Sequence, residues 1–177
     1  MSRIETTFAR LAERREKALV GFVTAGDPDA DRSLAIVRAM CAAGLDVLEL
    51  GVPFSDPLAD GPTIQKAALR SLQRRTSIKD VLGLVADVRK ESKIPLILMT
   101  YYNLIFKYGE ERFVSDAVSA GLDGVILPDL PPEEAGTLVP PARKAGCSTI
   151  ARRRARFVTT PSTTVRRSAS CRPYGSA

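Results

Sequence analysis

Histidine is absent from the 177 residues of this sequence. Because histidine is the commonest residue for acid–base work near neutral pH and a frequent zinc ligand, its absence excludes histidine-based catalytic triads, the common zinc sites and imidazole acid–base chemistry. Any catalysis must therefore depend on carboxylates, Lys, Tyr or backbone dipoles.

Cysteine and long apolar runs are also scarce. The three cysteines, Cys41, Cys147 and Cys171, have irregular spacing, and this odd number indicates a reduced, cytoplasmic chain and not a disulfide framework. The longest apolar run, around residues 94–102, is too short to span a bilayer, and no charged-then-apolar leader opens the chain. We therefore expect a cytoplasmic protein with no membrane segment.

Acidic residues are missing from the end of the chain. Residues 1–150 contain 19 Lys and Arg against 20 Asp and Glu, whereas residues 151–177 contain seven Arg and no acid. The net charge of +6 is therefore the sum of −1 in the body and +7 in the tail. The sequence divides accordingly into a body, residues 1–150, and an Arg- and Ser-rich tail, residues 151–177.

Three interpretations of the tail remain open. It has no helical or strand periodicity beyond Phe157 and Val158, and its composition is that expected of out-of-frame translation of a GC-rich gene, which we favour. A disordered tail with one sign of charge is the second interpretation. A basic arm that binds nucleic acid is the third and the least favoured.

The body alternates short apolar runs with amphipathic segments. Ser2 and Glu5 have the spacing of a capping box before the first helix, and Ala-Gly pairs precede several strands, where glycine ends helices. The expected strands are residues 18–24, 47–51, 96–100 and 124–127, with a fifth beginning at 148–150. The expected helices are residues 4–11, 31–43, 62–75, 78–91, 109–120 and 133–145.

Short, continuously apolar strands joined by helices predict a parallel sheet covered on both faces. Two architectures fit, an open doubly wound sheet and a (β/α)8 TIM barrel. About 150 residues hold four and a half βα units, so eight units would need roughly 250 residues, the usual barrel length. No nucleotide-binding glycine loop follows the first strand. We therefore favour an α/β fold of the barrel type that contains only the first four and a half units.

The segment with the clearest chemical content is LELGVPFSDPLADGP, residues 48–62. An apolar run here ends on Glu49, and a Pro- and Gly-rich loop then leads to Asp60. Burial of an ionised carboxylate in a strand lowers the stability of the fold by several kcal/mol unless the carboxylate has a partner, and an unpaired one is often retained for a function. A half-shielded carboxyl at the carboxyl end of a strand is suited to proton transfer, so we expect the chemistry in this segment.

Each of these carboxylates also has a structural interpretation. Glu49 could form an ion pair with a Lys or Arg. Asp60, which precedes Gly61 and Pro62, could be a turn residue or a helix cap, and the motif taken by itself favours that interpretation. Asp56 precedes Pro57 and is typical of a turn former or of a residue that contacts a partner.

Residues 49–65, ELGVPFSDPLADGPTIQ, closely resemble the signature of the tryptophan synthase alpha chain family. Three further matches support the resemblance, which covers residues 1 to about 150: GFVTAGDP at 21–28, MTYYNLIFKYG at 99–109 and GVILPDLPPEE at 124–134. The family fold is a (β/α)8 barrel of the ribulose-phosphate-binding type.

The resemblance implies retro-aldol cleavage of indole-3-glycerol phosphate to indole and glyceraldehyde 3-phosphate in tryptophan biosynthesis, a carbon–carbon lyase reaction. Glu49 matches the acid–base residue of the family, and Asp60 matches the carboxylate beside the indole N–H. The alpha chain would need no cofactor or metal of its own. It would pass indole to a beta chain that uses pyridoxal phosphate (PLP), in an alpha2beta2 heterotetramer.

The resemblance also implies two groups of contact residues. The expected indole pocket comprises Phe22, Met99, Tyr101 and Ile126, although residues at strand ends are often plain core. Asp129 would orient the loop above the site. The surface expected to contact the beta chain comprises Pro53, Asp56, Pro57, Asn103, Phe106 and Pro131, and the same residues would equally suit a stiff loop that packs on its own barrel.

The phosphate site of this family uses backbone N–H groups of loops after the later strands, and such positions would lie beyond Ile150. A barrel cut at four and a half units would also have two open sheet edges and a half-exposed core. We therefore expect this 177-residue chain neither to fold stably nor to turn over substrate by itself. Three other functions stay open: another phosphosugar isomerase or aldolase, which would need a Lys at a strand end or a metal pair; a nonenzymatic half-barrel; and a nucleic-acid-binding protein with a basic tail.

Overall fold

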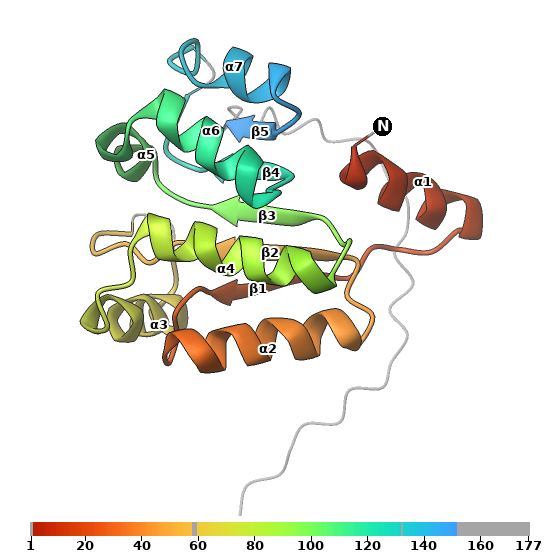
Figure 1. Ribbon diagram of the computed structural model, residues 1–177, viewed down its shortest axis with the longest axis horizontal. Coiled ribbons are helices and arrows are strands. Elements are labelled where there is room, and N and C mark those ends of the chain that lie inside the picture. The colour runs from red at the N-terminus through yellow and green to blue at the C-terminus, as the bar shows by residue number, and fades with distance from the viewer. Residues whose placement is uncertain (1, 58–59, 132, 152–177) are drawn as a thin grey trace, which may run out of the picture.

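The computed structural model describes residues 2–57, 60–131 and 133–151. Strands and helices alternate along it (Figure 1). The strands are β1 (Val20–Thr24), β2 (Val47–Gly51), β3 (Leu96–Met99), β4 (Gly124–Leu127) and β5 (Ser148–Ala151). The helices are α1 (Arg3–Arg14), α2 (Ala30–Ala42), α3 (Pro62–Gln73), α4 (Ile78–Glu91), α5 (Tyr102–Tyr108), α6 (Glu110–Ala120) and α7 (Val139–Lys144).

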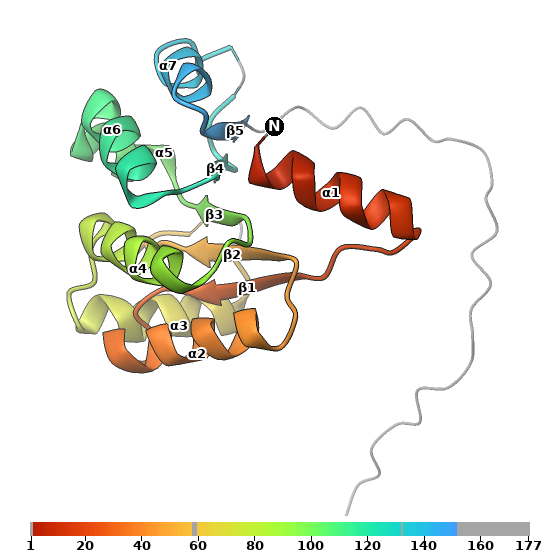
Figure 2. The same ribbon diagram turned by 45° about the vertical axis from the view of Figure 1, so that its right-hand side comes forward.

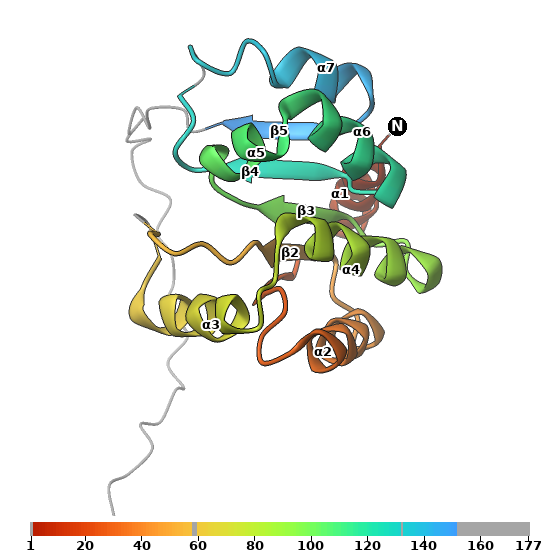
Figure 3. The same ribbon diagram turned by 60° about the vertical axis from the view of Figure 1, so that its left-hand side comes forward.

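The five strands are parallel and lie in the order β1-β2-β3-β4-β5. A doubly wound sheet reverses its strand order and so carries helices on both faces. Strands added in sequence by right-handed crossovers carry their crossover helices on one face only, and Figure 3 shows α2 to α7 along one side of the strands. The strand order therefore favours the barrel over the doubly wound sheet.

The two faces of the sheet have different surroundings. Leu48 and Leu50 of β2 and Leu96 and Leu98 of β3 are fully buried against α2, α4 and α6 in the main hydrophobic cluster. Glu49 of β2 and Met99 of β3 alternate with these leucines, lie on the concave inner face and are only half-buried. Because side chains alternate along a strand, the apolar residues that stabilise the fold and the residues available to a ligand belong to the same short strands.

The helices confirm most of the sequence pattern. Ser2 and Glu5 form the expected capping box of α1. Two helices differ from the expectation. The turn residues 133–138 precede α7, which has Pro140 and Pro141 in its first turn, where a ring without an N–H is tolerated. Helix α5, of seven residues, was not expected.

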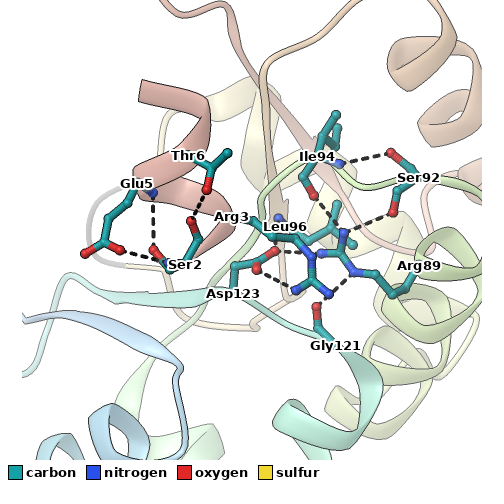
Figure 4. Close-up of polar contacts among 10 residues, drawn as sticks. All are labelled: Ser2, Arg3, Glu5, Thr6, Arg89, Ser92, Ile94, Leu96, Gly121 and Asp123. Atoms are coloured by element: carbon teal, nitrogen blue, oxygen red, sulfur yellow. Dashed lines mark hydrogen bonds and ion pairs between the residues drawn. The ribbon is translucent and has the colours of Figure 1, made fainter. Parts of the chain in front are cut away.

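Helix α1 lies at the amino ends of the strands, away from α3 and α5 (Figures 1 and 2). Its Arg3 donates from Nη1 to Asp123 Oδ1 at 2.8 Å, and Arg89 of α4 donates from Nη2 to Asp123 Oδ2 at 2.6 Å (Figure 4). The Leu96 backbone N–H also donates to Asp123 Oδ2 at 2.9 Å. One buried carboxylate thus joins α1, α4 and the start of β3.

Arg89 is the best-connected member of this cluster. Its Nε donates to the Gly121 carbonyl, and its Nη1 donates to the carbonyls of Ser92 and Ile94 (Figure 4). The loops before β3 and β4 are therefore fixed to α4 at the amino pole of the sheet, opposite the pole where a barrel enzyme carries its site.

The longest helix in the described part of the chain is α4, with 14 residues. No helix in residues 2–57, 60–131 and 133–151 is long and apolar enough to cross a membrane.

Candidate active site

Glu49 lies in the middle of β2, on the inner face of the sheet. It is the third of five residues in the strand and not its end, which corrects the expectation. Its neighbours in register are Phe22 of β1 and Ile97 of β3, and its side chain is half-buried. No ion pair within 4 Å involves Glu49 among the described residues, so the structural alternative of a Lys or Arg partner is not realised there.

Asp60 stands between β2 and α3 and is half-buried. The N-cap of α3 is Gly61, which makes no capping bond through a side chain. Asp60 takes part in the start of the helix through its backbone, whose carbonyl accepts a hydrogen bond from Gln65 Nε2 at 2.8 Å. The carboxylate is thus not the N-cap group of α3, and Asp60 belongs to the lining of a pocket.

This pocket, which we call the strand-end pocket, lies at the carboxyl ends of β1, β2 and β3. It combines Asp60 with three of the four residues expected to surround an indole ring. Its lining is Phe22, Thr24, Gly51, Val52, Asp60, Ile64, Ala68, Met99 and Tyr101. The cavity measures about 10 Å³, roughly the space that one water molecule occupies.

Two of the expected site residues lie beside the strand-end pocket and not in its lining. Ile126 pairs with Met99 in the register of β3 and β4, so it belongs to the adjacent inner-face position. Glu49 precedes Gly51 by two residues on the same face, about 6.6 Å along the strand. The carboxylates of Glu49 and Asp60 therefore belong to neighbouring layers of one concave surface.

Gly51 allows Phe22 to cover the strand-end pocket. A Cβ atom at residue 51 would lie 2.5 Å from Phe22 Cζ, a distance that real Cβ contacts do not reach. The aromatic ring thus lies directly over the Gly51 backbone. This close approach explains the small cavity, and it means that a ligand of indole size must displace the half-buried ring of Phe22 toward the open concave side.

The loops above the pocket are fixed by two contacts. Phe54, from the loop after β2, stacks on Tyr101 with ring centroids 4.8 Å apart, and Tyr101 is 5% exposed. The carboxylate of Asp129 accepts from the Tyr102 backbone N–H at 3.0 Å, which joins the loop after β4 to the start of α5. That Asp129 orients the loop above a bound substrate stays a prediction.

The residues expected to contact a partner differ in exposure. Asp56 and Asn103 are exposed, and Phe106 is 66% exposed although it is a large apolar residue. Pro57 and Pro131 are half-buried. Pro53 is buried, and at this position the alternative interpretation, a loop that packs on its own barrel, describes the structure.

Five residues of the lining were not among the sequence predictions, namely Thr24, Gly51, Val52, Ile64 and Ala68. Thr24 and Gly51 each follow an expected site residue by two positions, Phe22 and Glu49 respectively, and so share its face of the sheet. That alternation was the available signal. Nothing else in the sequence separates a pocket threonine from an ordinary strand-forming threonine.

A larger cavity of about 570 Å³ lies on the outer side, between α2 and α4. Charges of both signs line it, including Arg74, Arg75, Asp31 and Asp87, and it contains none of the expected site residues. We assign the site to the smaller strand-end pocket because parallel sheets and barrels bind ligands at the carboxyl ends of their strands, and this cavity is a groove between two helices.

The arrangement of the strand-end pocket suits acid–base chemistry on a flat, largely apolar molecule. Aromatic and aliphatic side chains supply most of the walls, Asp60 supplies a carboxylate, and Glu49 lies beside the pocket. Among the described residues, no group of three or more Cys, Asp or Glu side chains could hold a metal ion.

Comparison with known proteins identifies the family. The family model described as tryptophan synthase alpha chain matches residues 8–171. The tryptophan synthase alpha chain of Geotalea uraniireducens is 56% identical over 150 residues, which are 85% of this chain and 56% of that protein. The chain belongs to the tryptophan synthase alpha chain family.

Solved structures of this family share the fold. The alpha subunit from Legionella pneumophila is 44% identical and superimposes with a TM-score of 0.81 over 84% of this chain and 57% of that chain. A tryptophan synthase structure from Mycobacterium tuberculosis, at 33% identity, gives a TM-score of 0.81 over 85% and 58% of the two chains. The described residues therefore form the first five strands of a (β/α)8 barrel.

The chain spans little more than half the length of the curated tryptophan synthase alpha chains that it matches. The family match continues past residue 150, where we expected the resemblance to end. The alpha chain of Citrifermentans bemidjiense aligns over 176 residues at 48% identity. The interpretation of residues 151–177 as an out-of-frame tail stays a prediction, since residues 152–177 lie outside the described part.

Proposed function

We propose that the inner face around the strand-end pocket is the acid–base part of a site that cleaves indole-3-glycerol phosphate to indole and glyceraldehyde 3-phosphate. The observation that carries the proposal is the meeting of Asp60 with Phe22, Met99 and Tyr101 in one pocket, with Glu49 on the same face of β2. Membership of the tryptophan synthase alpha chain family is the reason for choosing this reaction among those that such a geometry could support.

In this proposal Glu49 moves protons. Its carboxyl group delivers a proton to indole C3 and then, as the carboxylate, removes one from the hydroxyl on the adjacent side-chain carbon. The bond between C3 and that carbon breaks, its electron pair returns to the indole ring, and the oxygen becomes the aldehyde oxygen. A half-buried position on an open concave face suits a carboxyl group that must reach two atoms in turn.

Asp60 would stabilise the charge that develops during this reaction. Protonation at C3 leaves positive charge on the indole nitrogen, and a fixed carboxylate beside the N–H stabilises that charge as it forms. Phe22, Met99, Tyr101 and the adjacent Ile126 would then enclose the ring. Removal of a hydrogen bond to a charged group typically costs about 1.5–3 kcal/mol, about tenfold to a hundredfold in affinity.

The wider assignments follow the family. Indole would pass to a PLP-dependent beta chain in an alpha2beta2 complex in the cytoplasm, and the alpha chain would need no cofactor. The exposed Asp56, Asn103 and Phe106, with Pro57 and Pro131, are the residues we propose for that contact. The phosphate group would require backbone donors from loops after later strands of the barrel, and these are not among residues 1–151.

Indole binding to the 177-residue chain tests the proposal. The chain contains no Trp, so a fluorescence titration with indole has no tryptophan background. We expect Asp60→Asn to weaken indole binding about tenfold or more. Asp56→Asn removes an exposed carboxylate from the same loop and serves as the matched control, with unchanged binding.

Turnover supplies a second measurement. Without donors for the phosphate, the 177-residue chain should release indole from indole-3-glycerol phosphate far more slowly than a full-length alpha chain. Turnover close to that of a full-length relative would contradict this expectation. Equal indole affinities for wild type and Asp60→Asn would contradict the assignment of the pocket itself.

A further inference from the structure

Thr24 lines the strand-end pocket and has a buried hydroxyl with no hydrogen-bond partner among the described residues. It is the last residue of β1 and is 5% exposed. Buried hydroxyls nearly always have a partner, since leaving one without a partner is costly. A hydroxyl left in this state at the edge of a candidate site is available to another group.

The surroundings of the Thr24 hydroxyl point to one acceptor. The strand opposite presents Gly51, which has no side chain to accept a hydrogen bond, and Phe22, Met99 and Ile64 of the same lining are apolar. The remaining side-chain oxygens of this lining belong to Asp60, a carboxylate, and to Tyr101, whose hydroxyl is the weaker acceptor. A hydroxyl donates and a carboxylate only accepts, so the two groups are chemically complementary.

We propose that Thr24 is a positioning residue that donates a hydrogen bond from Oγ1 to the Asp60 carboxylate when a ligand occupies the pocket. This inference rests on the proposed function. The bond holds one carboxylate oxygen and leaves the other directed at the N–H of an indole ring. The preferred ligand class is a planar aromatic heterocycle with a ring N–H, and Thr24 acts on it through Asp60.

Thr100 provides an internal control. Its Oγ1 is likewise buried without a partner among the described residues, and it is 1% exposed. It follows Met99 by one position and does not belong to the lining of the pocket. A substitution at Thr100 therefore reproduces the removal of a buried orphan hydroxyl at a strand end without touching the site.

The test is a double-mutant cycle with indole as the probe, measured by the fluorescence titration in the 177-residue chain. We expect Thr24→Val to weaken indole binding about three- to tenfold, the effect of one hydrogen bond, and Thr24→Ser to stay within about twofold of wild type. In an Asp60→Ala background, Thr24→Val should have no further effect, because the side-chain acceptor that the Thr24 hydroxyl orients is gone. Thr100→Val should leave indole binding unchanged.

Thermal unfolding separates positioning from structure. Since the hydroxyl has no partner in the fold, Thr24→Val should leave the melting temperature unchanged or raise it. A fall in melting temperature would reveal a structural partner and overturn the inference. Unchanged indole binding by Thr24→Val, alongside weakened binding by Asp60→Asn, would also overturn the inference. So would an equal weakening by Thr24→Val in the wild-type chain and in the Asp60→Ala variant. A wild-type chain that shows a cooperative thermal transition and yet binds no indole would overturn the proposed function as well.

Discussion

Replacement of Asp123 by Asn should destabilise the protein more than the loss of any exposed ion pair. The Asp123 side chain is 5% exposed and receives Arg3 at 2.8 Å and Arg89 at 2.6 Å. It also accepts the Leu96 backbone N–H. Asparagine keeps the size and one acceptor oxygen but removes the charge, so the perturbation is electrostatic and creates no cavity.

The expected magnitude follows from the exposure of the two arginines. Arg89 is 14% exposed, and burial lowers its pKa, with the carboxylate of Asp123 as the main opposing influence. Loss of the partner of a buried charge typically costs about 3–5 kcal/mol. Arg3 is 46% exposed, and pairs of that kind contribute about 0–1 kcal/mol.

Urea denaturation followed by far-UV circular dichroism measures the difference. With a slope near 2 kcal/mol per molar urea, Asp123→Asn should lower the midpoint by about 1.5–2.5 M, and Arg3→Gln by less than about 0.5 M. If Asp123→Asn lowered the urea midpoint no further than Arg3→Gln, the buried contact between Asp123 and Arg89 would not stabilise the amino pole of the sheet.

Three further substitutions or reactivities can be tested. Gly51→Ala should change the affinity for indole in the fluorescence titration, since its Cβ would lie 2.5 Å from Phe22 Cζ and force the ring that indole must displace to shift; an unchanged affinity would contradict the close approach. Burial raises the pKa of Cys147 to about 11, so about one thiol in a thousand is ionised at pH 8. Mass spectrometry should therefore find Cys41 alkylated well before Cys147 in the folded chain, and equal rates would count against this burial. Hydrogen bonds from Ser77 lower the pKa of Asp80, so its stabilisation is present above the ordinary carboxyl range and is lost as pH falls through the lowered pKa. Asp80→Asn should accordingly reduce the melting temperature at pH 7 and have little effect near pH 2, whereas a constant difference would contradict the capping role.

The strands were predictable because each is a short apolar run. Leu48 and Leu50, and likewise Leu96 and Leu98, are fully buried against helices. Such burial requires apolar residues at these positions, so it is visible in the local sequence. Helix α5 was not predictable, since seven residues are too few to display a helical period. Its first N–H is bound by Asp129, 27 residues later in the sequence, which is information that only the tertiary fold contains.

The site was predictable in part for the same reason. Phe22, Met99 and Tyr101 are brought together because parallel strands end at one edge, so strand-end residues become neighbours. Glu49 was expected near the carboxyl end of its strand, yet the expected strand 47–51 and the observed β2 both contain it as the third of five residues. The alternation of Leu48, Glu49 and Leu50 already places Glu49 opposite the core face, so the predicted face of Glu49 does not depend on where the strand ends.

The central claim is that an indole ring binds at the carboxyl ends of the strands, on the inner face of the sheet. The most direct measurement is the set of intermolecular nuclear Overhauser effects between indole and the methyl groups of the labelled chain. The account predicts contacts to the methyl groups of Met99 and Ile64 in the strand-end pocket. Contacts to Leu34 and Leu84, which line the larger cavity between α2 and α4, with none to Met99, would contradict it.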